Sequence, residues 1–162
     1  MNRSHCTSGF TLAEVLMAVI LIGISLAAIL GANGYYTMSN EASLDFTTAE
    51  TLMEHIRELT TTLPVTDPQS GTTTFGPEEG SVADYDDVDD FDGSVFSPPI
   101  DAGRSQISDL ASYSQAITVE NVSLNNLSNV VADGSTPFYR VTVQILHNGT
   151  EVMSARWIRT VY

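Results

Sequence analysis

The chain has 162 residues, with 20 acidic and six basic side chains and a formal net charge of −14 at pH 7. This charge argues against binding to nucleic acid or to an anionic lipid surface, both of which attract basic proteins. The one cysteine, Cys6, precludes an intramolecular disulfide, so the fold must rely on packing or on a bound ion.

The first 34 residues join a short polar stretch to a long apolar one. Residues 1–9 are mostly polar, whereas residues 15–32 carry no charge and one hydroxyl, that of Ser25. Together with residues 10–14 the run reaches the roughly 20 residues that cross a hydrocarbon core. Glu14 is therefore an acid inside a predicted membrane span, at a cost on the order of 3 kcal/mol, which indicates a functional role.

Residues 9–14, Gly-Phe-Thr-Leu-Ala-Glu, resemble the prepilin motif of type IV pilins and of type II secretion pseudopilins. The resemblance implies that a membrane-embedded prepilin peptidase cleaves after Gly9 and N-methylates Phe10. It also implies that Glu14 meets the N-terminal amine of a neighbouring subunit, where the two charges neutralise each other when subunits stack with a stagger.

Two other interpretations apply to the same residues. Thr11 and Glu14 fit a capping box, in which a Thr and a Glu three residues later satisfy free amides at a helix start. The segment also fits an ordinary signal anchor. We favour the prepilin interpretation, because in a secretory signal the apolar run precedes the small residue at the cleavage site, and here it follows Gly9.

A single helix is predicted to extend beyond the membrane. No proline occurs between Phe10 and Pro64, so a helix of about 53 residues ending at Leu63 is allowed. Apolar residues recur at steps of three or four, as on one face of an amphipathic helix. They are Tyr35, Met38, Ala42, Phe46, Ala49, Met53, Ile56, Leu59 and Leu63.

An acidic loop region is predicted at residues 64–114, which are rich in turn-forming residues. Its densest part is Asp84–Gly93, called here the aspartate run, in which Tyr85, Val88 and Phe91 recur every third place as hydrophobic anchors. An Asp-Asp-Val-Asp-Asp-aromatic segment of this kind is similar to one in minor pilins of the mannose-sensitive haemagglutinin type.

Calcium is one hypothesis for the aspartate run, because hard cations prefer carboxylate and carbonyl oxygens. The candidate ligands are Asp84, Asp86, Asp87, Asp89, Asp90 and Asp92. The run does not fit the EF-hand pattern, since Val88 and Pro99 stand where that loop requires acids. The alternative, which we favour, is an acidic loop paired with arginines or left in solvent.

The C-terminal third is predicted to form antiparallel strands. Residues near 117–124 alternate with a slip at Glu120-Asn121, which indicates a bulge. Strands at 138–146 and 152–162 follow, joined at residues 147–149. A three-residue loop with Gly149 in a bulge is favoured over a two-residue turn, because it groups the apolar residues of both strands on one face. That register sets Arg140 opposite Arg156, and the aspartate run is the expected partner of these arginines.

These expectations combine into an α+β, pilin-like fold, with a long N-terminal helical spine packed on a small antiparallel sheet head. The predicted divisions are a prepilin leader at 1–9, a transmembrane and assembly helix at 10–34, an amphipathic helix half at 35–63, the acidic loop region at 64–114 and the sheet head at 115–162. No catalytic set is predicted, because the three histidines are scattered and no nucleophile motif occurs. The chain is therefore expected not to be an enzyme, with no cofactor other than the hypothesised calcium.

The expected function is that of a filament subunit, and a minor subunit is favoured over a major one. Its implied partners are prepilin peptidase, other pilin or pseudopilin subunits, the inner-membrane assembly platform and membrane lipid. Arg3 is the only basic residue before Arg57, which places the N-terminus in the cytoplasm and the rest outside the bacterial inner membrane. A periplasmic or extracellular filament would follow. The alternative is a membrane-anchored binding module that does not polymerise.

Overall fold

The computed structural model describes residues 9–67, 76, 77 and 79–161. One helix, α1 (Leu12–Thr62), runs without a break for 51 residues. Its end two residues before Pro64 agrees with the geometry that proline imposes on the preceding residue. The predicted single long helix is therefore confirmed, with ends within two residues of those expected, while the leader residues 1–8 lie outside the described residues.

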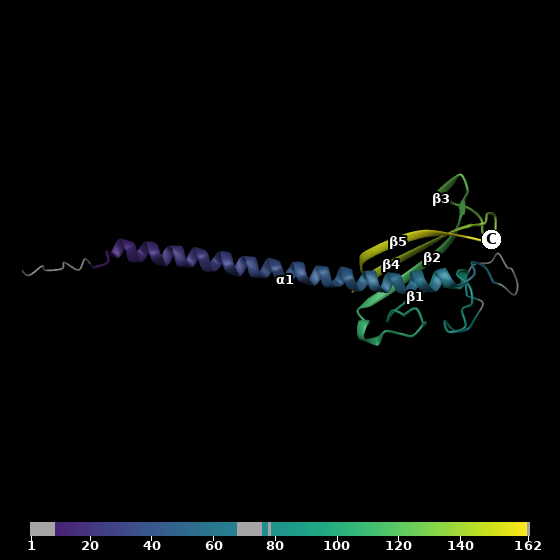
Figure 1. The fold of residues 1–162 in the computed structure, drawn as a ribbon, viewed down its shortest axis with the longest axis horizontal. Helices are drawn as coiled ribbons and strands as arrows, with labels where there is room; N and C mark the ends of the chain where they lie inside the picture. Colours follow the sequence, from purple (N-terminus) through teal and green to yellow (C-terminus); the bar gives the residue numbers. More distant parts are fainter. Residues whose placement is uncertain (1–8, 68–75, 78, 162) are drawn as a thin grey trace, which may run out of the picture. The chain divides into compact units, whose positions relative to one another are not determined.

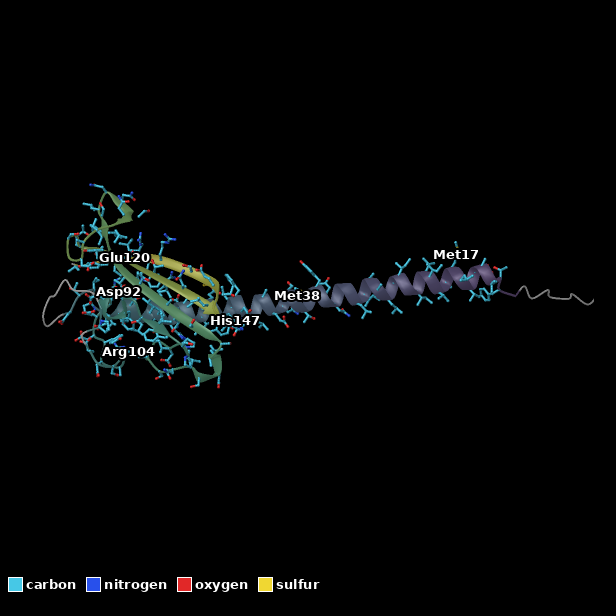
Figure 2. The ribbon with its side chains drawn as sticks, turned by 180° about the vertical axis from the view of Figure 1, so that it is seen from behind. Met17, Met38, Asp92, Arg104, Glu120 and His147 are labelled. Carbon is cyan, nitrogen blue, oxygen red and sulfur yellow. The ribbon has the colours of Figure 1, made fainter. Side chains whose placement is uncertain are left out.

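The chain divides into an N-terminal unit, Met1–Ser43, and a C-terminal unit, Leu44–Tyr162. Within the N-terminal unit every helical side chain is exposed, and Figure 2 shows side chains standing out around Met17 and Met38. By length and composition this helix can cross a membrane, since its most apolar 18-residue window has a mean hydropathy of 2.7.

The C-terminal unit contains the last turns of α1 and a five-stranded antiparallel sheet, which Figure 1 shows running beside one another. The strands pair in the order β1 (Val95–Phe96), β2 (Tyr113–Ser123), β4 (Phe138–His147) and β5 (Thr150–Thr160), and β3 (Asn126–Val130) forms a hairpin with β2 alone. Two short 3-10 helices, η1 (Asp89–Phe91) and η2 (Ser108–Leu110), lie in the loop region. The α+β, pilin-like fold class is therefore confirmed.

The core lies between α1 and one face of the sheet. The helix buries Ala49, Leu52, Met53, Ile56 and Leu59 against residues such as Ile117, Val141, Val143 and Ile145. The predicted apolar face is therefore buried only from Ala49 onwards. Tyr35, Met38 and Phe46 are exposed.

The β4–β5 hairpin has the predicted faces but a different turn. Asn148 and Gly149 both have positive φ angles, 50° and 79°, as a two-residue hairpin turn requires. The register then shifts after Leu146↔Glu151, so that Ile145 pairs with Met153 and Val152 is the extra residue. The expected three-residue loop is wrong. The bulge lies in the strand instead of the turn, and it restores the same apolar grouping.

The predicted pair of facing arginines is also wrong, because the bulge shifts β5 by two residues relative to the expected register. Arg140 faces Ile158, and Arg156 faces Thr142. The partner of Arg140 is Glu120 on β2, with 2.7 Å between Nη2 and Oε2. The charge of Arg140 is thus neutralised within the sheet, and the expected role of the aspartate run as its partner is not observed.

Candidate functional sites: the carboxylate cluster and the helix start

The aspartate run is a fixed part of the C-terminal unit. Tyr85, Val88 and Phe91 are all buried, and the rings of Tyr85 and Phe91 meet edge to face with centroids 5.0 Å apart. The backbone N–H of Val88 donates to the carbonyl of Pro64 at 3.0 Å, which fastens the run to the end of the helix. The three predicted anchors are therefore confirmed.

Another contact joins the run to the sheet. The Asp92 carboxylate accepts a 2.7 Å hydrogen bond from the backbone N–H of Val119 on β2. Figure 2 labels Asp92 in the C-terminal unit. The aspartate run is thus held at its middle by the helix exit and near its C-terminal end by a central strand.

Three of the six aspartates of the run are buried. Asp87, Asp89 and Asp90 are at most 1% exposed, while Asp84 is exposed. The expectation of a loop left in solvent is therefore wrong for these three aspartates. Among the described residues, Arg57 pairs with Glu54 and Arg140 pairs with Glu120, and both acids lie outside the run.

Two buried aspartates hold the backbone of the run in place. Asp90 Oδ2 accepts the N–H groups of Asp86 and Asp87 at 2.9 and 3.3 Å, and Asp87 Oδ1 accepts the N–H of Asp90 at 3.1 Å. One oxygen of each carboxylate is thereby fixed by local hydrogen bonds. The second oxygen of Asp87, Oδ2, is buried and accepts no hydrogen bond from the described residues.

Five carboxylates converge here in two overlapping groups. In the first group, oxygens of Asp67, Asp86 and Asp87 lie within 4.8 Å of one another, and in the second the same holds for Glu79, Asp86 and Asp90. We call these five residues the carboxylate cluster. It contains three of the six predicted calcium ligands, and Asp84, Asp89 and Asp92 lie outside it. Sequence reasoning missed Asp67 and Glu79, since no local pattern sets them apart from other loop acids.

The electrostatics of the cluster disfavour negative charge. Burial, followed by the neighbouring Glu79 carboxyl and the charge of Asp87, raises the pKa of Asp90 to about 6 from its ordinary 3.8. A carboxyl whose pKa is raised on folding stabilises the fold when it is protonated and loses that contribution as the pH rises from about 4 to about 6. Ionisation of Asp90 at neutral pH is therefore electrostatically unfavourable for the folded state.

The helix start is built by Thr11 and Glu14. Glu14 Oε2 accepts hydrogen bonds from the backbone N–H of Thr11 at 2.8 Å and from its hydroxyl at 2.9 Å. The Thr11 hydroxyl accepts in turn from the N–H of Glu14 at 3.3 Å. This is the reciprocal geometry of a capping box. Gly9 and Phe10 precede it and are exposed.

The comparison with family models identifies the same segment. Residues 5–30 match the family described as the prokaryotic N-terminal methylation motif. The chain carries the prepilin-type motif of type IV pilins and pseudopilins. No curated protein and no solved structure matches the chain.

The prepilin-type motif contains Gly9, Phe10 and Glu14 and runs directly into the apolar part of α1. Its combination with an apolar N-terminal helix fits anchoring in the inner membrane. The motif and the capping box are compatible, because the cap occupies one oxygen of Glu14 and explains how the helix begins.

A further polar cluster joins α1 to the far end of the sheet. The Tyr113 hydroxyl donates to Asp45 Oδ1 at 2.7 Å, and His147 Nδ1 lies 3.1 Å from Asp45 Oδ2. The rings of Tyr113 and His147 are stacked with centroids 4.3 Å apart. The hydrogen bond from Tyr113, together with that from His147, holds the pKa of Asp45 below its ordinary 3.8. Sequence reasoning treated this histidine as an isolated turn residue.

Proposed function

We propose that this chain is a non-enzymatic subunit of a type IV pilus or of a type II secretion pseudopilus. In this proposal prepilin peptidase cleaves after Gly9 and N-methylates Phe10, and the product assembles into a helical filament. The observation that supports it is the methylation motif at residues 5–30, which includes the start of α1. The apolar side chains of this helix are all exposed in the N-terminal unit.

Charge explains why assembly would follow cleavage. Cutting before Phe10 creates an ammonium group in an apolar layer, where Glu14 is the one acid. Each charge is costly alone, and the two neutralise each other when neighbouring helices pack with a stagger. In the capping box Glu14 Oε2 already binds Thr11, so the incoming amine would share that carboxylate with the cap or displace it.

The proposal includes a location and a role. The N-terminus lies in the cytoplasm, the chain crosses the inner membrane once, and the mature subunit enters a periplasmic or extracellular filament through the assembly platform. A minor subunit is favoured over a major one, because the mature chain has an acidic C-terminal unit and no cysteine with which to form a disulfide.

Mass spectrometry of the mature N-terminus tests the processing step. The chain is co-expressed with a prepilin peptidase, as wild type, as Gly9→Val and as the control Gly23→Val, at a position where an added Cβ has no atom within 4 Å beyond the neighbouring helix backbone. We expect wild type and control to begin at N-methyl-Phe10 and the Gly9 variant to stay uncut. An uncut wild-type chain would instead leave a signal anchor.

A second experiment tests assembly. Glu14→Gln is compared with Glu41→Gln, a matched change at an exposed position of the same unit. We expect the Glu14 variant to be cleaved normally but to enter sheared filament fractions at least about tenfold less, the effect of an unpaired amine in lipid. Equal incorporation of both variants would contradict the role of Glu14.

The second candidate function is a membrane-anchored binding module that does not polymerise. The carboxylate cluster favours it, because a built acidic site has no evident use in helix packing. A cleaved chain that stays monomeric in the membrane, with no filament fraction under any condition tested, would support this module over the filament subunit.

A further inference from the structure

The carboxylate cluster brings together side chains from three separate segments. Asp67 follows the end of α1, Glu79 lies farther along the loop, and Asp86, Asp87 and Asp90 belong to the aspartate run. Asp86 belongs to both groups of three, so the two groups adjoin each other. All ligand atoms in it are carboxylate oxygens, which are the donors of hard cations.

The spacing of these oxygens suits one central ion. Two oxygens on opposite sides of a calcium ion are separated by about twice the calcium–oxygen distance of 2.3–2.6 Å, or roughly 5 Å. The oxygens in each group lie within 4.8 Å of one another. Carboxylates at such separations repel each other strongly in the absence of a cation.

A separate observation points to a missing ligand. The Asp87 side chain is 1% exposed, and its Oδ2 atom accepts no hydrogen bond from any described residue. Its Oδ1 atom is held by the N–H of Asp90, so the carboxylate is fixed and cannot turn toward solvent. A buried, ionisable oxygen without a donor is costly unless something positive occupies its free side.

We propose that the carboxylate cluster is a calcium site that fastens the aspartate run to the end of α1. The ion would bind Asp67, Glu79, Asp86, Asp87 and Asp90, with backbone carbonyls or water completing the six to eight oxygens calcium takes. Calcium is favoured over magnesium because five carboxylates from an irregular loop give a flexible, crowded shell, whereas magnesium demands octahedral geometry and keeps several waters. The proposal does not depend on filament assembly.

Bound calcium would add to contacts that already join the same segments. The backbone N–H of Val88 donates to the carbonyl of Pro64, three residues before Asp67, so the aspartate run already contacts the end of the helix at this point. An ion across Asp67 and Asp87 would join the helix exit to the aspartate run and stabilise the native state alone, since an unfolded chain cannot present these ligands together.

The test measures thermal unfolding and direct binding on the full chain in detergent at about pH 7.5, after removal of metal with a chelator. We expect CaCl₂ to raise the melting temperature by several degrees in a saturable way and MgCl₂ to have a much smaller effect. Titration calorimetry with CaCl₂ should give a dissociation constant between about 10⁻⁶ and 10⁻³ M. Absence of calcium binding in this range would overturn the proposal, as would an equal response to magnesium.

Two variants of the same run supply a matched comparison. Asp87→Asn removes a cluster ligand, and Asp84→Asn removes the same charge at an exposed position outside the cluster. We expect the first to weaken calcium binding at least about tenfold and the second to leave it unchanged. An equal loss of calcium binding in both variants would show that the effect comes from overall charge, and it would contradict the proposed site. If Asp87→Asn does not fold, Asp67→Asn replaces it, because Asp67 is a cluster residue from a different segment of the chain.

Discussion

The two parts of α1 are one helix with two different environments. Residues 12–43 bury no side chain within the chain, whereas residues 44–62 bury six. Both parts are rich in apolar residues, so composition alone does not decide burial. The difference lies in their contacts: the second part packs against the sheet, whereas the apolar side chains of the first part are exposed.

The largest expected effect separates the two parts directly. Ile56→Ala removes a fully buried side chain, and Ile24→Ala makes the same change where the side chain is 63% exposed. We expect the first to lower the free energy of unfolding of the C-terminal unit by about 2–5 kcal/mol and the second to leave it unchanged. Denaturant unfolding of the detergent-solubilised chain, followed by Trp157 fluorescence, measures both. Similar losses would show that the two parts unfold as one unit.

A smaller effect is expected at the end of the buried part. Arg159 on β5 donates to the carbonyls of Thr60 and Leu63. Carbonyls at the end of a helix have no N–H of the same helix to accept from, so Arg159 takes that place. Arg159→Gln should therefore cost about 1–3 kcal/mol of unfolding free energy. Arg156→Gln on the same strand is the control, because Arg156 is exposed. A cost as large in the control would indicate a general charge effect in this acidic protein.

The smallest effect is expected at Asp45, near the start of the second part. Its pKa is lowered in the fold, so its contribution to stability is present above the ordinary value of 3.8 and is lost as the pH falls through the lower folded value. Asp45→Asn should lower the melting temperature at neutral pH and converge with wild type in strong acid. Asp109→Asn, an exposed change, serves as control. A pH-independent difference would assign the loss to Asn packing instead of charge.

Local patterns predicted the features that depend on neighbours in the sequence. The long helix followed from the absence of proline, and the processing segment followed from six consecutive residues. The faces of β4 and β5 were also correct, because a register shift of two residues leaves Val141, Val143 and Ala155 on the same face. The turn was wrong because a bulge in the strand has the same effect on side-chain direction as a longer loop.

Features that depend on distant residues were not predicted. The apparent slip at Glu120-Asn121 is no bulge in the pairing with β4, since Asn121 lies in register with Tyr139 and is buried. Its side-chain amide donates to the carbonyls of Thr136 and Phe138, so a polar residue takes an inward position in the strand. Asp67 and Glu79 likewise join the carboxylate cluster through tertiary folding, which no spacing rule encodes.

The capping box at the helix start has a consequence for the timing of maturation. The hydrogen bonds that close the first turn join Thr11 to Glu14 and to Val15, all on the far side of the Gly9–Phe10 bond from residues 1–9. Removal of residues 1–9 thus breaks none of these hydrogen bonds. The first turn of the helix does not depend on residues 1–9. The proposed cleavage would therefore not require this turn to melt and form again.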